Sequence, residues 1–168
     1  MKILIILASL SVVVSGIRIA IFSDVHLNTT YDYTCGFSFC YDQGTYDLDS
    51  PPALFSTMLD DLQSNYNSYG KTIDAILVQG DMIVHGLSTS DPSSNNWPQQ
   101  KAVLQELIAQ LQKRFPNTPV IFGIGNNDVL QHYEAPVPHD KAMFYGDLFT
   151  EWFTNIPANA AQPNILGN

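Results

Sequence analysis

Three short runs of β-branched and other apolar residues constrain the fold of this 168-residue chain most strongly. They occupy residues 17–22, 75–78 and 119–124. Each run has strand length and ends at Ser, Gly, Asp or Asn, which is typical of a buried strand. Between and after them lie segments whose apolar residues recur at helical spacing. These segments occupy residues 50–66, 103–115 and 141–154. The alternation predicts an α/β fold with parallel strands joined by right-handed crossovers.

The boundaries of these elements are marked by turn and cap residues. Ser50 precedes Pro51 and Pro52, which predicts a helix N-cap followed by proline in the first turn. Residues 88–99 crowd Ser, Asn, Asp and Pro together and predict a loop. Neither an internal repeat nor a second domain is evident, so we expect one domain over residues 17–168.

The composition limits the partners of this domain. Hydrophobic residues make up 45% of the chain, which is too apolar for a disordered protein of this length. Asp and Glu number 16 against 7 Lys and Arg, for a formal net charge of -9. This excess of acid argues against a nucleic-acid-binding surface or an anionic-membrane surface. It is compatible with a protein that binds divalent cations through carboxylates.

The first residues resemble a targeting segment. Lys2 precedes the apolar run 3–14, and the small pair Ser15-Gly16 follows it. This order is typical of a signal peptide over residues 1–16 and predicts secretion or delivery to a lysosome-like compartment. The run is shorter than the roughly 20 residues that span a bilayer, so no transmembrane span is expected after cleavage. A buried first strand of a cytosolic protein is the alternative.

Two further features suit an oxidising, glycosylating compartment. Cys35 and Cys40 are the two cysteines of the chain, and their even number and close spacing fit a small-loop disulfide. Asn28-Thr29-Thr30 matches the N-glycosylation pattern and makes Asn28 a candidate site.

Metal-competent residues follow each predicted strand. Asp24 and His26 follow the first, Asp81 the second and Asn126 the third. Because the carboxyl ends of parallel strands meet at one edge of a sheet, we expect these side chains to converge. If the backbone stays extended, Asp24 and His26 share one face. Carboxylate, imidazole and amide groups together suit zinc, manganese or iron better than calcium.

Glycines precede two of these positions. Gly80 and Gly125 would let the chain turn sharply and direct the next side chain into a cleft. Each motif has a simpler interpretation, since Asp-x-His and Gly-Asp are common in turns, and residues 126–128 could cap a helix. Their occurrence at the ends of three successive strands favours a shared site.

The three motifs resemble the first signature blocks of the calcineurin-like metallophosphoesterases. The blocks are Asp24-Val25-His26, Gly80-Asp81 with His85-Gly86, and Gly125-Asn126-Asn127-Asp128. Within that superfamily the chain most resembles the acid sphingomyelinase-like phosphodiesterases. The Cys35/Cys40 loop, the Asp49-Ser50-Pro51-Pro52 helix entry and the form of the second block carry this closer likeness.

The resemblance implies a fold and an activity. The fold is the βαβαβ amino-terminal half of a four-layer α/β/β/α sandwich. The activity is hydrolysis of a phosphoric diester, such as a sphingomyelin-type lipid or another small molecule, by a hydroxide held between two divalent ions.

The resemblance also assigns roles to individual residues. Asp24 and His26 would hold one ion, Asp81 would bridge both, and Asn126 would hold the second, with Zn²⁺ the expected metal. His85 corresponds to a histidine near the substrate phosphate, although a surface histidine is the alternative interpretation.

One position departs from the family pattern. Asn127 stands where the family usually has a histidine that acts in the reaction. An amide can donate a hydrogen bond but cannot relay a proton near neutral pH, so His85 or His132 would have to supply it. An Asn-Asn-Asp block is associated with the endopolyphosphatase branch, which makes an endopolyphosphatase-like hydrolase the alternative.

The family also completes its metal sites with downstream histidines. His132 and His139 lie too close to the third block to take these parts, so we expect the chain to be the amino-terminal part of the domain. A non-catalytic binding module of the same fold is therefore a further alternative.

Overall fold

The computed structural model describes residues 16–31, 44, 48–88 and 96–160. Almost all of the predicted signal peptide lies outside these ranges, as do both cysteines of the predicted disulfide, Cys35 and Cys40. Both therefore stay predictions.

The centre of the fold is a three-stranded parallel sheet in the order β1-β2-β3. The strands are β1 (Ile19–Phe22), β2 (Ala75–Val78) and β3 (Val120–Phe122). In the register of the sheet, Ile21 lies beside Leu77 and Leu77 beside Ile121. The predicted α/β class and the parallel crossovers are confirmed, and each strand lies within its predicted run.

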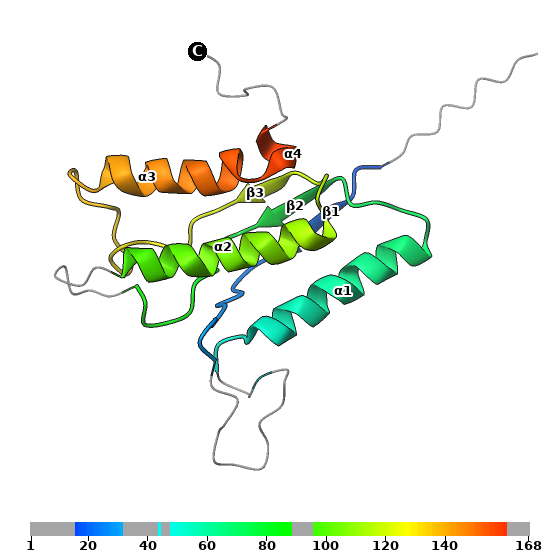
Figure 1. Ribbon diagram of the computed structural model, residues 1–168, viewed down its shortest axis with the longest axis horizontal. Helices are drawn as coiled ribbons and strands as arrows, with labels where there is room; N and C mark the ends of the chain where they lie inside the picture. The colour runs from blue at the N-terminus through cyan, green and yellow to red at the C-terminus, as the bar shows by residue number, and fades with distance from the viewer. Residues whose placement is uncertain (1–15, 32–43, 45–47, 89–95, 161–168) are drawn as a thin grey trace, which may run out of the picture.

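The helices cover one face of this sheet. They are α1 (Pro52–Ser68), α2 (Trp97–Arg114), α3 (Lys141–Phe149), the π-helical turn η1 (Thr150–Thr154) and α4 (Pro157–Ala160). Figure 1 shows α2 crossing in front of the strands, with α1 and α3 on either side of it. On the opposite face Ile19, Ile21 and Ile121 are 51%, 59% and 59% exposed, so no described element covers it.

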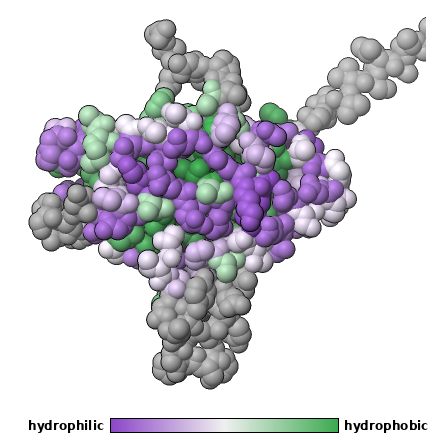
Figure 2. Space-filling view, viewed as in Figure 1, coloured by the Kyte–Doolittle hydropathy of each residue, from purple (hydrophilic) through white to green (hydrophobic). Residues whose placement is uncertain are grey.

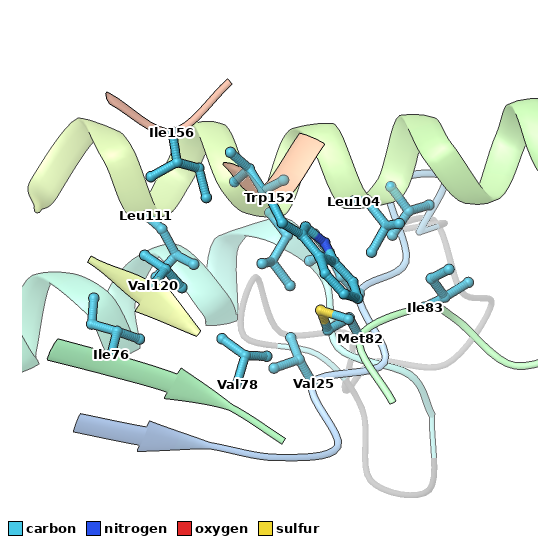
Figure 3. Close-up of a cluster of buried hydrophobic side chains, with 14 of the residues drawn as sticks. Val25, Ile76, Val78, Met82, Ile83, Leu104, Leu111, Val120, Trp152 and Ile156 are labelled. Atoms are coloured by element: carbon cyan, nitrogen blue, oxygen red, sulfur yellow. The ribbon is translucent and has the colours of Figure 1, made fainter. Parts of the chain in front are cut away.

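The core between the sheet and α2 also anchors the loops that leave the strands (Figure 3). Leu104 and Leu111 of α2 pack there with Val78 and Val120. Buried residues that immediately follow β1 and β2 join the same cluster: Val25, Leu27, Met82 and Ile83. Each predicted ligand in these two loops therefore has a fully or largely buried neighbour in sequence, which fixes its backbone.

Two predicted boundaries were wrong at the starts of helices. Helix α2 begins at Trp97, inside the predicted loop 88–99, because Gln100 N–H donates to the Asn96 carbonyl and Trp97 is buried in the core. Ser50 was expected to cap α1, yet Pro51 is the N-cap and makes no side-chain cap bond. The backbone of Ser50 instead bonds to His26 and Asn28.

The predicted third helix over residues 141–154 is confirmed in extent, although its last turn is π-helical. The short helix α4 after it was not predicted. Asn159 in α4 is buried, and its side-chain amide bonds to both the N–H (2.8 Å) and the carbonyl (2.7 Å) of Val120. This side chain satisfies backbone groups of the edge strand β3 that would otherwise lack a partner.

The outer surface around α2 is mainly hydrophilic (Figure 2). Within the described part of the chain, no helix is both long and apolar enough to cross a membrane.

Candidate metal centre

The segment that leaves β1 lies between two other backbone segments at the carboxyl edge of the sheet. On one side, His26 N–H donates to the Asp81 carbonyl at 3.0 Å, and Leu27 N–H to the Met82 carbonyl at 2.8 Å. On the other side, Ser50 N–H donates to the His26 carbonyl at 3.0 Å. The backbone of residues 24–28 is thus held by hydrogen bonds on both flanks.

Three predicted metal ligands have left-handed backbone conformations. Asp24, His26 and Asp81 have φ angles of 53°, 41° and 50°. The condition that the backbone stays extended through Asp24 and His26 was therefore wrong. The left-handed region costs a non-glycine residue roughly 1–2 kcal/mol. Strain of this kind persists where surrounding structure enforces it, and it clusters at functional sites.

The side chains of these three residues nevertheless converge. Their nitrogen and oxygen donors all lie within 4.8 Å of one another, a spacing from which one metal ion can be held. His26 Nε2 lies 3.9 Å from Asp24 Oδ1. His26 Nδ1 lies 3.1 Å from the Ile83 carbonyl, which can only accept, so Nδ1 carries the hydrogen. The bond leaves the lone pair on Nε2, as a metal-binding histidine requires.

The loop after β3 packs closely against the loop after β2, and two glycines, Gly80 and Gly125, allow this close approach. A Cβ on Gly80 (φ 109°) would lie 2.5 Å from the Gly125 nitrogen, and one on Gly125 would overlap the Asp81 side chain. Both positions therefore exclude any larger residue. Asn127 N–H donates to Asp81 Oδ1 at 2.9 Å, which ties the third loop to the Asp81 carboxylate.

Asn126 lies between Gly125, which packs against Asp81, and Asn127, which hydrogen-bonds to it. Its Nδ2 is 2.8 Å from His132 Nε2. Because an amide nitrogen only donates, His132 Nε2 accepts this bond, and the oxygen of Asn126 faces away from His132. His132 therefore orients the Asn126 amide, and its Nε2, which accepts this bond, carries no hydrogen to supply in a reaction.

Asn127 is not placed on the open surface of the site. The residue is 2% exposed, and its side-chain oxygen is buried without a hydrogen-bond partner among the described residues. His139 is also apart from the centre, where it is mostly exposed and pairs with Asp140 at 3.4 Å. Asn28 lies in a tight turn, where its Oδ1 accepts from Thr30 N–H at 3.0 Å.

His85 is brought to the centre by the loop after β2. Its ring stacks on the His26 ring with centroids 4.0 Å apart and an angle of 21° between the planes. His85 Nδ1 lies 2.6 Å from Asp49 Oδ1. Asp24, His26, Asp49 and His85 line one open pocket of about 420 Å³, together with Leu48 and Ser50.

Sequence reasoning did not foresee the part played by Asp128. Its carboxylate is fully buried and accepts hydrogen bonds from the N–H groups of Met82 (2.9 Å), Ile83 (3.1 Å) and Gly125 (2.9 Å). Burial raises the pKa of Asp128, and the N–H donors oppose this shift. Asp128 thus joins the second and third loops beneath the ligands. The sequence signal that could have indicated this role is the position of Asp128 directly after Asn126 and Asn127.

Comparison with known proteins identifies the family of the chain. The family model for calcineurin-like phosphoesterases matches residues 17–167. The chain belongs to this family. A curated relative, an endopolyphosphatase of Schizosaccharomyces pombe, is 30% identical over 91 residues. That match covers 52% of this chain and 15% of the relative, so the chain spans a small part of the relative's length.

Proposed function

We propose that the protein is a metal-dependent phosphoester hydrolase whose metal centre is formed by Asp24, His26, Asp81 and Asn126. The observation that carries the proposal is the convergence of the Asp24, His26 and Asp81 donors within 4.8 Å at the ends of two adjacent strands. Membership of the calcineurin-like phosphoesterase family supports it.

The donor set fits divalent transition metals. Two carboxylates, an imidazole with its Nε2 lone pair available and an oriented amide are ligands that zinc, manganese and iron accept. Zn²⁺ is the metal we propose, in two sites that share Asp81. Bound divalent ions supply charge for the phosphoryl oxygens and lower the pKa of bound water.

The residues of this chain would position the substrate and the ligands. The Ile83 carbonyl fixes His26, and His132 fixes the Asn126 amide. His85, more than half exposed in the pocket, can donate a hydrogen bond to a phosphoryl or leaving-group oxygen through Nε2 when its imidazole is protonated. Asn127 contributes through its backbone N–H, which holds the Asp81 carboxylate.

Two substrate classes are consistent with this centre. A phosphoric diester of the sphingomyelin type is supported by the likeness of the Asp49-Ser50-Pro51-Pro52 entry and the second block to acid sphingomyelinase-like enzymes. A polyphosphate is supported by the 30% identity to the fission yeast endopolyphosphatase and by the Asn-Asn-Asp block. Secretion or lysosomal delivery is part of the proposal and is supported by the apolar run 3–14 and the Asn28 sequon.

The test compares Asp81→Asn with wild type. Purified full-length protein is loaded with zinc or manganese and assayed on bis-(p-nitrophenyl) phosphate and on long-chain polyphosphate. We expect metal-dependent turnover of one of the two by wild type. The variant should lose turnover and bound metal, although its amide oxygen can still accept from Asn127 N–H. Asp61→Asn, on the exposed surface of α1, is the matched control.

Absence of turnover on both substrates, with metal content unchanged in Asp81→Asn, would contradict the proposal. Metal binding without turnover would instead favour the non-catalytic module of the same fold.

A further inference from the structure

We propose that Asp49 is a positioning residue that fixes the tautomer and orientation of His85. The two residues are 36 positions apart in the sequence and meet through two hydrogen bonds. Asp49 Oδ1 lies 2.6 Å from His85 Nδ1, and Asp49 Oδ2 accepts from the His85 backbone N–H at 3.2 Å. One carboxylate thus engages both the ring and the main chain of His85.

The direction of the ring bond follows from its chemistry. An ionised carboxylate only accepts, so Nδ1 must carry the hydrogen. In neutral His85 the lone pair then lies on Nε2, the nitrogen that remains to face a ligand in the pocket. A short bond of this kind also restricts rotation of the ring about its side-chain torsions.

Asp49 is largely buried and precedes a residue whose backbone is hydrogen-bonded on both sides. Its side chain is 18% exposed, whereas that of His85 is 59% exposed, so the carboxylate forms the wall of the pocket and the imidazole its open surface. The next residue, Ser50, donates to the His26 carbonyl and accepts from Asn28 N–H at 2.9 Å. Asp49 and the adjacent Ser50 therefore connect His85 to the backbone of the predicted ligand His26.

An alternative use of the same side chains is a third metal site, because the donors of His26, Asp49 and His85 also lie within 4.8 Å of one another. Two features disfavour it. Imidazole lone pairs lie in the ring plane, and the nearly parallel, stacked rings of His26 and His85 do not direct them to one point. A tetrahedral zinc ion would also hold a nitrogen and an oxygen ligand about 3.3 Å apart. The observed 2.6 Å is a hydrogen bond.

The consequence for the reaction rests on the proposed function. Because Asp49 keeps the hydrogen on Nδ1, neutral His85 presents Nε2 to the substrate as an acceptor, and Nε2 donates only when the ring is protonated. Replacing the aspartate of such a pair by asparagine preserves shape but allows the wrong tautomer. In the native geometry, the amide of Asp49→Asn places an NH2 group where one of the two carboxylate oxygens lies, so one of the two hydrogen bonds to His85 is lost.

The test uses NMR and kinetics on full-length protein. Long-range ¹H–¹⁵N correlation, assigned with His85→Gln, reports which imidazole nitrogen is protonated when the ring is neutral. We expect the Nδ1–H form in wild type and its loss or mixing with the Nε2–H form in Asp49→Asn. On the substrate that wild type hydrolyses, kcat should fall about 10- to 100-fold with KM and metal content little changed. Asp49→Glu should recover part of the loss.

Asp140→Asn is the matched control, because Asp140 pairs with the mostly exposed His139 outside the pocket. An Nε2–H tautomer in wild-type His85, or a spectrum of Asp49→Asn identical to wild type, would overturn the proposal. If wild type shows no turnover, the proposed function fails, and the NMR spectra still decide the role of Asp49.

Discussion

At the scale of single residues, the centre depends on three side chains held in unfavourable backbone conformations. The sequence identified Asp24, His26 and Asp81 because each follows a predicted strand. It did not indicate their positive φ angles, which result from backbone bonds to partners more than 20 residues away, such as Asp24 N–H to the Gly80 carbonyl at 3.2 Å.

Strain at Asp24 can be measured with two substitutions. Asp24→Gly and Asp24→Ala both remove the carboxylate, but only glycine adopts a φ of 53° without steric cost. We expect the free energy of unfolding of the glycine variant to exceed that of the alanine variant by about 1 kcal/mol, measured by urea denaturation without metal. Equal stability, or a less stable glycine variant, would contradict the assignment of strain.

The sequence did not reveal the residues that hydrogen-bond to the site residues and orient them. Asp128, Asp49 and His132 each orient another residue of the site, and none of these contacts leaves a periodic pattern in the sequence. Hydrogen bonds between side chains of separate loops depend on the final packing, whereas a strand that ends in aspartate is visible locally.

At the scale of elements, Asp147 connects the third helix to the second. Its Oδ2 accepts from Trp97 Nε1 at 2.7 Å and lies 3.2 Å from Lys101 Nζ. The hydrogen bond from Trp97 and, after it, the interaction with Lys101 lower the pKa of Asp147. A lowered pKa stabilises the folded state above the ordinary carboxyl pKa, and this contribution is lost as the pH falls through the lowered value.

Asp147→Asn should therefore destabilise the protein in a pH-dependent way. The amide can still accept from Trp97 but carries no charge for Lys101. We expect the free energy of unfolding to fall by about 1 kcal/mol at pH 7 and the difference from wild type to shrink as the pH falls below about 4. Denaturation curves at several pH values, with Asp61→Asn as control, test this. An equal difference at pH 7 and at acid pH would refute it.

Strands and helices were predicted well where periodicity was strong, as in β2 and α3. The start of α2 was missed because Trp97 and Pro98 lie in a polar segment that reads as a loop until the burial of Trp97 is known. The role of Asn159 at the edge of β3 could not be predicted, since its contacts are tertiary.

At the scale of the whole molecule, the helices cover one face of the sheet and leave the isoleucines of β1 and β3 exposed on the other. The predicted α/β class and the meeting of three loops at the carboxyl edge of the sheet are confirmed by the fold. The alternation of strands and helices was enough to predict both features, because connections between parallel strands have one preferred hand. Metal identity and substrate depend on groups that local patterns do not report.

Anomalous X-ray scattering from crystals of the zinc-loaded full-length protein tests the central claim most directly. We predict a zinc peak within about 2.0–2.2 Å of His26 Nε2 and of carboxylate oxygens of Asp24 and Asp81, and a second peak that shares Asp81 and contacts the Asn126 oxygen. Data collected above and below the zinc edge identify the metal. Zinc bound elsewhere, with the Asp24, His26 and Asp81 side chains unoccupied at saturating metal, would contradict the account.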